Sequence, residues 1–151
     1  PYTGACAIFS NRVLNRKPPY IFEDGNQVRD FIHVTDIAQA NLLALESTSA
    51  DYMALNIGTG KPTSILDLAN ALIQLYGYDM KTEIPGTYRK GDIRHCFADV
   101  TKAAKHLRFE AKTGLNEGLL ELSHWAKEQG WGATDLFDRA LEELKQRRLS
   151  K

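Results

Sequence analysis

Hydrophobic residues recur three and four positions apart along most of the chain, which predicts amphipathic helices because residues at that spacing share one helix face. The clearest helix follows Ser64, which opens it with a capping pattern, and Gly77 ends it. Thr35 or Asp36 is predicted to cap the second helix, and Asp99 the fourth. The predicted helices span residues 5–15, 37–46, 65–76, 100–107, 113–129 and 135–149.

Shorter segments that are rich in β-branched and aromatic residues predict strands between these helices. They span residues 20–22, 28–34, 53–57, 82–84 and 93–98. The expected fold class is therefore α/β, mostly helical with short strands. A length of 151 residues suits one domain that covers 1–151.

The charge and composition exclude several classes of protein. Nineteen basic residues balance nineteen acidic ones, whereas nucleic-acid binding usually needs a basic excess on one face. No apolar run approaches the roughly 20 residues of a membrane span. The four histidines and two cysteines show no metal-ligand spacing. We therefore expect no metal, membrane or nucleic-acid partner, and we expect Cys6 and Cys96 to be reduced thiols.

The loop at 58–61 (GTGK) is similar to the end of a phosphate-binding loop. However, Leu55 stands where that motif has its first glycine, and Pro62 where it has Ser or Thr. We interpret the loop as a strand-to-helix turn whose glycines allow close packing, with Asn56 fixing the turn and His33 bonding locally. The sequence also contains no dinucleotide glycine fingerprint and no tyrosine followed four residues later by lysine. No residue of this chain is therefore predicted to be catalytic or to bind a cofactor.

Three clusters hold candidate ligand-binding residues. Arg29 could fork two hydrogen bonds onto a phosphate, or it could pair with Asp30 at a sheet edge. Arg89 and Asp92 could address a phosphate and a ribose diol, or they could lie in a solvated loop. Phe22 could offer a platform for a base, or it could belong to the core. From spacing alone these alternatives stay open.

Taken in order, these segments resemble the extended short-chain dehydrogenase/reductase family, specifically its NAD-dependent nucleotide-sugar epimerases and dehydratases. The matching stretches are PYTGACAIFSNRVLN (1–15), PPYIFEDGNQVRDFIHVTDIAQANLLALE (18–46), ALNIGTGKPTSILDLANAL (54–72), YRKGDIRHCFADVTKAAKHL (88–107) and EGLLELSHWAKEQ (117–129). The tail DLFDRALEELKQRR (135–148) resembles tails of deoxysugar epimerases that act on dTDP-rhamnose. In this family such stretches form the C-terminal, substrate-binding part of a Rossmann-type enzyme.

The resemblance implies a role for each candidate residue. Arg29 matches the arginine that contacts the substrate diphosphate in the family's RDF motif. Arg89 and Asp92 match the RxGD pair, with the arginine on phosphate and the aspartate on ribose hydroxyls. Phe22 matches the aromatic beside the base, and Ile21 is its backbone neighbour.

The resemblance further implies a sugar 4-epimerase that acts on a UDP- or dTDP-linked sugar. Hydride leaves C4 of the sugar for NAD, which is held by an N-terminal Rossmann half, and returns to the other face. The sugar must turn while the molecule stays bound, so the nucleotide diphosphate is the anchor. Two arginines suit that anchor, because charge-assisted hydrogen bonds are about twice as strong as neutral ones. The complete enzyme is expected to be a cytoplasmic homodimer.

Other functions stay open at this point. The same part of the fold serves NDP-sugar dehydratases, decarboxylases and reductases. The chain could also be a non-catalytic nucleotide-sugar-binding module, or an assembly unit that makes contact through its final amphipathic helix. Because it begins at Pro1, we expect the N-terminal half to be missing and the isolated chain to bind without turnover. If 53–57 joins the sheet of that half, self-association or marginal stability of the isolated chain is expected.

Overall fold

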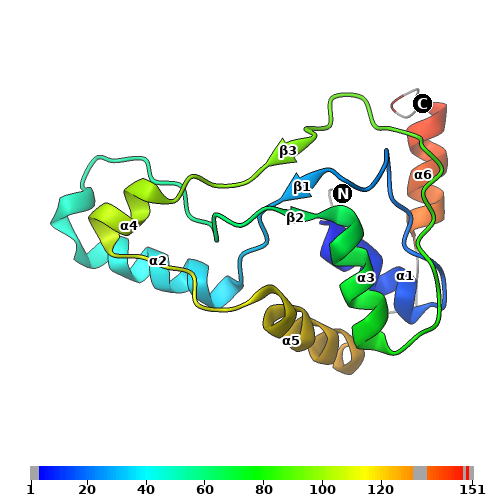
Figure 1. Cartoon of the computed structure of the whole chain (residues 1–151), viewed down its shortest axis with the longest axis horizontal. Coiled ribbons are helices and arrows are strands. Elements are labelled where there is room, and N and C mark those ends of the chain that lie inside the picture. The colour runs from blue at the N-terminus through cyan, green and yellow to red at the C-terminus, as the bar shows by residue number, and fades with distance from the viewer. Residues whose placement is uncertain (1–3, 131–135, 148, 150–151) are drawn as a thin grey trace. The chain divides into compact units, whose positions relative to one another are not determined.

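The computed structural model describes residues 4–130, 136–147 and 149. The chain forms two compact units, each of which is described by itself. The α1/α3 unit comprises Pro1–Gln27, Ser64–Arg94 and Leu119–Lys151. The α2/α4 unit comprises Val28–Thr63 and His95–Gly118. Figure 1 labels the helices and strands of both units.

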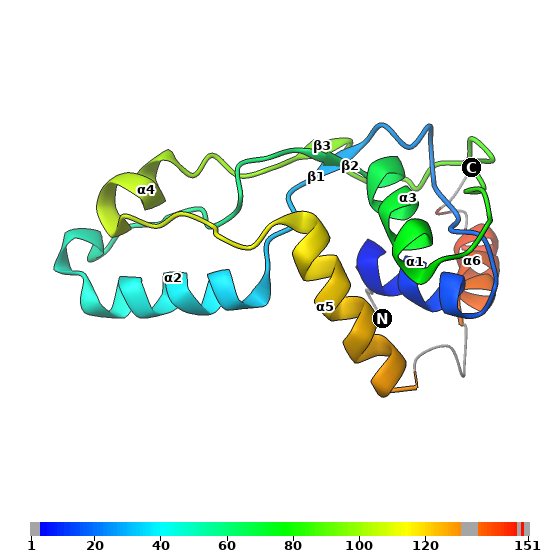
Figure 2. The same ribbon diagram turned by 60° about the horizontal axis from the view of Figure 1, so that its bottom comes forward.

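The α1/α3 unit is built around two helices that lie side by side in both views, α1 (Ala5–Leu14) and α3 (Ile65–Tyr76) (Figures 1 and 2). It also holds most of α5 (Leu115–Glu128) and the whole of α6 (Phe137–Gln146). The predicted caps of α3 are confirmed, since the Ser64 hydroxyl accepts from the Asp67 backbone N–H and Gly77 adopts a left-handed conformation. The core side chains Val13, Ile21, Leu68 and Leu72 are fully buried.

The α2/α4 unit pairs α2 (Val34–Glu46) with α4 (Thr101–Leu107), and a short 3-10 helix η1 (Thr48–Ala50) lies between them in the chain. Figures 1 and 2 show α2 and α4 running alongside each other. A small buried core joins them, with partly buried aliphatic side chains packed around it. Its members are Ala40, Ala103, Leu107 and Phe109.

The sheet is smaller than the sequence predicts. Strand β1 (Val28–Arg29) pairs in parallel with β3 (His95–Cys96), and β2 (Thr63–Ser64) lies on the other side of β1. The strands predicted at 20–22 and 82–84 meet in a single parallel bridge between Tyr20 and Glu83. The strand predicted at 53–57 was wrong, because no described residue pairs with that segment and a strand forms only against a partner.

The predicted caps of α2 were also wrong. The cap is His33, whose backbone is extended and whose Nδ1 accepts from the Thr35 backbone N–H at 3.4 Å. His33 Nδ1 also bonds the Thr35 hydroxyl at 2.8 Å, which confirms the local bonding expected of this histidine. Asp36 lies one turn further in and is buried, where it accepts from the backbone N–H groups of Lys112 and Thr113.

Three further helix boundaries differ from prediction. Asp99 accepts from the Thr101 backbone N–H at 3.0 Å, but Val100 holds the cap position of α4. Helix α5 begins at Leu115 rather than at 113. Helix α6 ends at Gln146 rather than at 149, and residue 135, where it was predicted to begin, lies outside the described residues.

We expect the isolated chain to self-associate through α2. Val34, Leu42 and Leu45 on this helix are 72%, 54% and 84% exposed, which is an unusual concentration of apolar surface. Light scattering coupled to size-exclusion chromatography should show oligomers whose size falls on dilution. The double change Leu42→Glu and Leu45→Glu should leave a monomer, whereas Gln39→Glu adds charge without removing apolar area and should not. A wild-type chain that stays monomeric at high concentration would contradict this expectation.

Candidate functional site

The aromatic candidate lies in a segment of the α1/α3 unit that begins at Tyr20. Ile21 is 0% exposed and donates its backbone N–H to the Glu83 carbonyl oxygen at 2.8 Å, so it anchors the segment in the core. Phe22 is half-buried, and its ring meets Tyr20 edge to face with centroids 5.3 Å apart. The Gln27 side-chain amide donates to the Phe22 carbonyl oxygen at 2.8 Å. Ile21 is therefore a core residue, while Phe22 is held at the edge of the core.

The turn after Phe22 is held in an uncommon backbone conformation. Glu23 has a φ of +59°, which is costly for a residue with a side chain. Its backbone N–H donates to the Thr87 carbonyl oxygen at 2.6 Å, which ties the turn to the segment that carries Arg89. Gly25 has a φ of +81°, and a Cβ there would lie 3.0 Å from Leu66 Cβ, so only glycine fits.

Arg89, Asp92 and Phe22, which the sequence offered in two separate clusters, lie together in the structure. Arg89 Nη2 donates to Asp92 Oδ2 at 2.6 Å, and the guanidinium lies over the Phe22 ring at 5.0 Å from its centroid. The Arg89 Nε is buried and has no hydrogen-bond partner among the described residues. An arginine has five N–H donors in a planar fork, so this pairing leaves Arg89 able to bind an anion.

Arg89 and Asp92 border an open depression of about 570 Å³ within the α1/α3 unit. Its charged lining mixes arginines with carboxylates: Glu23, Asp24, Arg89, Asp92 and Arg94. The hydrogen bond from Arg94 is the main reason that the pKa of the Asp24 carboxyl lies well below its usual range. The depression therefore presents charged side chains of both signs, and one of them, Arg89, also lies over the half-buried Phe22 ring.

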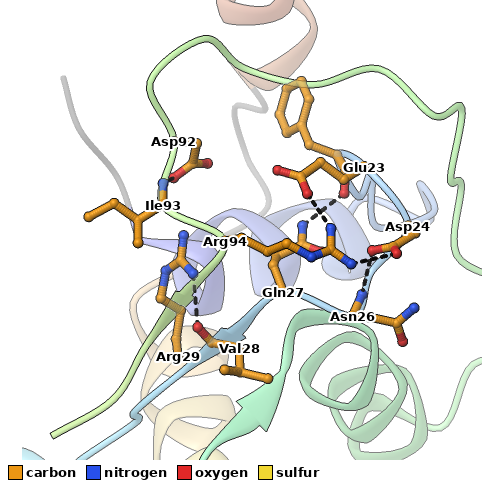
Figure 3. A network of polar contacts seen from close by, with 10 residues as sticks. Glu23, Asp24, Asn26, Gln27, Val28, Arg29, Asp92, Ile93 and Arg94 are labelled. Atoms are coloured by element: carbon orange, nitrogen blue, oxygen red, sulfur yellow. Dashed lines mark hydrogen bonds and ion pairs between the residues drawn. The ribbon is translucent and has the colours of Figure 1, made fainter.

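Arg94 is a site residue that the sequence did not indicate. Its Nη1 donates to Glu23 Oε2 at 2.6 Å and its Nη2 to Asp24 Oδ2 at 2.7 Å (Figure 3). The two carboxylates precede Arg94 by about 70 residues. No local spacing could reveal such a pair, and the only sequence signal was the position of Arg94 two residues after Asp92.

The C-terminal helix also reaches this part of the α1/α3 unit. The Phe137 ring lies 5.4 Å from the Tyr20 ring and under the Arg12 guanidinium at 4.6 Å, and Arg12 Nη1 donates to Asp138 Oδ1 at 2.8 Å. The backbone N–H of Lys90, next to Arg89, donates to the Leu149 carbonyl oxygen at 2.8 Å. Phe137, at the start of this helix, is therefore used inside the unit, which weakens the alternative of a pure assembly helix.

Arg29 belongs to the other unit and is described there by itself. It is half-buried on β1 opposite Cys96 of β3, and its Nη1 donates to the Val28 carbonyl oxygen at 2.8 Å. The Asp30 carboxylate accepts hydrogen bonds from the Thr59 and Gly60 backbone N–H groups in the loop after residue 57. The role of Arg29 at a diphosphate stays a prediction.

The glycine loop at 58–60 is closed around Asp30. The Asp30 carboxylate accepts from the Thr59 backbone N–H and hydroxyl, from the Gly60 N–H at 3.0 Å and from the Ala98 N–H at 3.2 Å. A Cβ at Gly58 would lie 2.5 Å from that carboxylate. An acceptor carboxylate already holds the backbone donors that a phosphate would need. The loop is thus the close-packed turn that was predicted.

A second cavity, of about 540 Å³, lies within the α2/α4 unit and was not predicted. Phe31 and Phe109 contribute its aromatic walls, and Lys61, Arg108 and Lys112 make its polar lining mainly basic.

Among residues 4–130, 136–147 and 149, no group of three His, Cys, Asp or Glu side chains could hold a metal ion. No helix in that part of the chain is long and apolar enough to cross a membrane.

The chain is similar in sequence to known epimerases. The model of the NAD dependent epimerase/dehydratase family matches residues 2–58. The dTDP-L-rhamnose 4-epimerase of Burkholderia thailandensis is 33% identical over 128 residues, which cover 85% of this chain and 35% of that protein. The UDP-glucose 4-epimerase of Bacillus subtilis is 42% identical over 113 residues, which cover 70% of this chain and 32% of that protein.

Solved structures agree with the sequence matches. A UDP-glucose 4-epimerase from Thermotoga maritima, solved with UDP-glucose, superimposes with a TM-score of 0.79 at 38% identity, and the match covers 85% of this chain and 41% of that one. The chain is similar to proteins of this epimerase family. It matches the C-terminal part of nucleotide-sugar 4-epimerases, and its mostly helical fold with a small sheet is that of their substrate-binding domain.

The epimerase match concerns only a part of the relatives. The chain spans about a third of the length of the curated relatives it matches, 35%, 39% and 32% for three of them. A related UDP-glucuronic acid 4-epimerase from Bacillus cereus, with a TM-score of 0.72 at 27% identity, was solved in complex with NAD. Related epimerases therefore bind nucleotide sugars and NAD, whereas the ligands of this chain are a matter of proposal.

Proposed function

We propose that this chain is the substrate-binding part of an NAD-dependent NDP-sugar 4-epimerase and that it holds the nucleotide diphosphate of the substrate. The observation that carries the proposal is the placement of Arg89 over Phe22, 5.0 Å from the ring centroid, with Asp92 bonded to the same guanidinium. A cation above an aromatic platform suits a ligand that joins an anion to a flat base.

Each group in this cluster has a separate task in the proposal. Arg89 donates to the diphosphate through terminal N–H groups that Asp92 does not use. Asp92 accepts from ribose hydroxyls, and Phe22 packs against the base. Ile21 is fully buried and fixes the backbone next to Phe22. Arg29 is proposed as the second diphosphate ligand, on the basis of the family motif.

This arrangement suits epimerisation at C4 for a simple reason. The sugar must present both of its faces in turn, so binding energy has to come from a part of the substrate that does not move. NAD would supply the oxidation and re-reduction of the sugar in the complete enzyme. We place it outside this chain, because the glycine loop at 58–60 is filled by Asp30 and the sequence has no dinucleotide fingerprint. A Rossmann half and a homodimeric assembly complete the proposal.

Thermal unfolding of the 151-residue chain in the presence of UDP, dTDP and GDP tests the proposal. A ligand present at about 100 times its Kd stabilises the folded state by roughly 2.7 kcal/mol, so at least one nucleoside diphosphate should raise Tm by several degrees. Uridine lacks the diphosphate and serves as the matched control, for which little change is expected. If the chain unfolds cooperatively but none of the three nucleotides raises its Tm, the binding proposal fails.

A second experiment distinguishes the substrate-binding part of an enzyme from a non-catalytic nucleotide-sugar-binding module. Both would bind UDP, but only the enzyme part requires an NAD-binding half. Joining the chain to the preceding half of a related 4-epimerase should restore epimerase activity if the proposal holds. A fusion that folds and binds both NAD and UDP-glucose but interconverts no sugar would favour the silent module.

A further inference from the structure

Arg94 makes a two-pronged contact with the turn that follows Phe22. Its two terminal nitrogens donate to carboxylates on consecutive residues, Glu23 at 2.6 Å and Asp24 at 2.7 Å (Figure 3). A planar guanidinium can hold two separate carboxylates in fixed directions, which a lysine cannot do. The contact joins residues 70 and 71 positions apart in the chain.

The turn at Glu23 and Asp24, which Arg94 contacts, has a strained backbone. Glu23 sits at a φ of +59°, a conformation that a residue with a side chain keeps only when its surroundings enforce it. Its backbone N–H donates to Thr87 at 2.6 Å, two residues before Arg89. Strain of this kind concentrates at sites where a side chain must be aimed. Here the side chain next to the strained residue is Phe22, over which Arg89 lies.

We call the contact of Arg94 with Glu23 and Asp24 the clamp. Its contribution to stability does not explain why it is there. The Arg94 side chain is 46% exposed and that of Asp24 is 50% exposed, and ion pairs this exposed add little to the free energy of unfolding. What the clamp can do is restrict motion. It fixes the segment that bears Phe22 to the segment that bears Arg89, and both segments lie in the same unit.

We propose that Arg94 is a positioning residue of the nucleotide site. By binding Glu23 and Asp24, it keeps the Phe22 ring and the Arg89 guanidinium in fixed positions relative to each other. The inference rests on the proposed function, because it concerns how well the same site binds a nucleoside diphosphate. Arg94 acts through the clamp and does not touch the ligand. Ordering a side chain before binding lowers the entropy cost of binding, so losing the clamp should weaken binding by roughly three- to tenfold.

Titration calorimetry with UDP, or with whichever nucleoside diphosphate binds the unchanged chain, tests this role. Arg94→Ala should raise Kd by about three- to tenfold and leave Tm nearly unchanged. Arg94→Lys keeps the charge but cannot bridge both carboxylates, so it should behave like Arg94→Ala. If Arg94→Lys binds as tightly as the unchanged chain, long-range charge and not the clamp is responsible, and the inference is overturned.

A second background separates a clamp from a direct ligand contact. In a chain that carries Glu23→Ala and Asp24→Ala, Arg94 has lost both acceptors and the clamp is already broken, so adding Arg94→Ala should change Kd very little. If Arg94 contacted the diphosphate itself, Arg94→Ala would weaken binding in this background at least as much as in the unchanged chain. That second result would overturn the inference while leaving the proposed function intact.

Amide hydrogen exchange provides a readout that needs no nucleotide. In Arg94→Ala, the Glu23 backbone N–H should exchange faster, because its bond to Thr87 loses the support of the clamp. The α3 amides serve as an internal control and should not change. Unaltered exchange at Glu23 would overturn the inference. A failure of the unchanged chain to bind any nucleotide would instead contradict the proposed function, and the inference would fall with it.

Discussion

Replacing Arg89 with alanine is expected to weaken binding of UDP, dTDP or GDP by about 10- to 100-fold. The estimate follows from the loss of hydrogen bonds between a charged donor and a charged acceptor, which contribute roughly 1.5–3 kcal/mol. The change also removes the cation above Phe22 and frees Asp92 from its 2.6 Å bond. Titration calorimetry on the folded variant measures the change in Kd directly.

The neighbouring lysine offers a matched control for Arg89. Lys90→Ala removes the same formal charge one residue away, and the backbone N–H through which Lys90 contacts Leu149 is retained. Its Kd should stay within about twofold of the unchanged chain, because an exposed charge contributes little. Equal losses in the two variants would mean that net charge attracts the nucleotide and that Arg89 is not a specific ligand.

Replacing Asp30 with alanine should lower the free energy of unfolding of the α2/α4 unit by roughly 1–3 kcal/mol, because several partly buried donors then lose their shared acceptor. Those donors are the N–H groups of Thr59, Gly60 and Ala98 and the Thr59 hydroxyl. Denaturant unfolding, followed by the exchange of amides in α2 and α4, reports the loss. Asp51→Ala changes an exposed aspartate of the same unit and should cost far less.

The same carboxylate predicts how stability depends on pH. Burial raises the pKa of Asp30, but the hydrogen bonds from Thr59, Gly60 and Ala98 outweigh it and hold the pKa below its usual value. A group whose pKa is lowered by folding contributes stability above its unfolded pKa, about 3.9, and loses it as the pH falls through the folded value. Asp30→Asn should therefore flatten the acid limb of stability against pH. An unchanged acid limb would contradict this role.

The sequence was most informative where structure is local. Helix α3 has Ser64 as its N-cap and Gly77 as its C-cap, as the capping pattern required, because both signals act within one turn of the helix. The cap of α2 was missed because His33 is an unusual cap, and Asp36 was instead used by backbone groups more than 70 residues away. The segment 53–57 has the composition of a strand, but pairing depends on a partner that composition does not reveal.

For the candidate site, too, the sequence indicated some features and the fold was needed for the others. The sequence and the family pattern singled out Phe22, Arg89 and Asp92 as candidate ligand residues, but in two separate clusters. Their actual arrangement, with the arginine bonded to the aspartate and lying over the ring, could not be. Arg94 was missed because its partners are distant in sequence. Long-range ion pairs of this kind require the fold before they can be recognised.

Mapping of backbone amide chemical shifts while UDP, dTDP or GDP is added tests most directly whether this chain holds a nucleotide diphosphate where we place it. The largest shifts should fall in 20–26 and 87–94, the two segments that carry Phe22, Arg89 and Asp92, and uridine should produce much smaller ones. Shifts confined to the cavity lined by Lys61 and Arg108, or no shifts with any nucleotide on the folded chain, would contradict the proposed site.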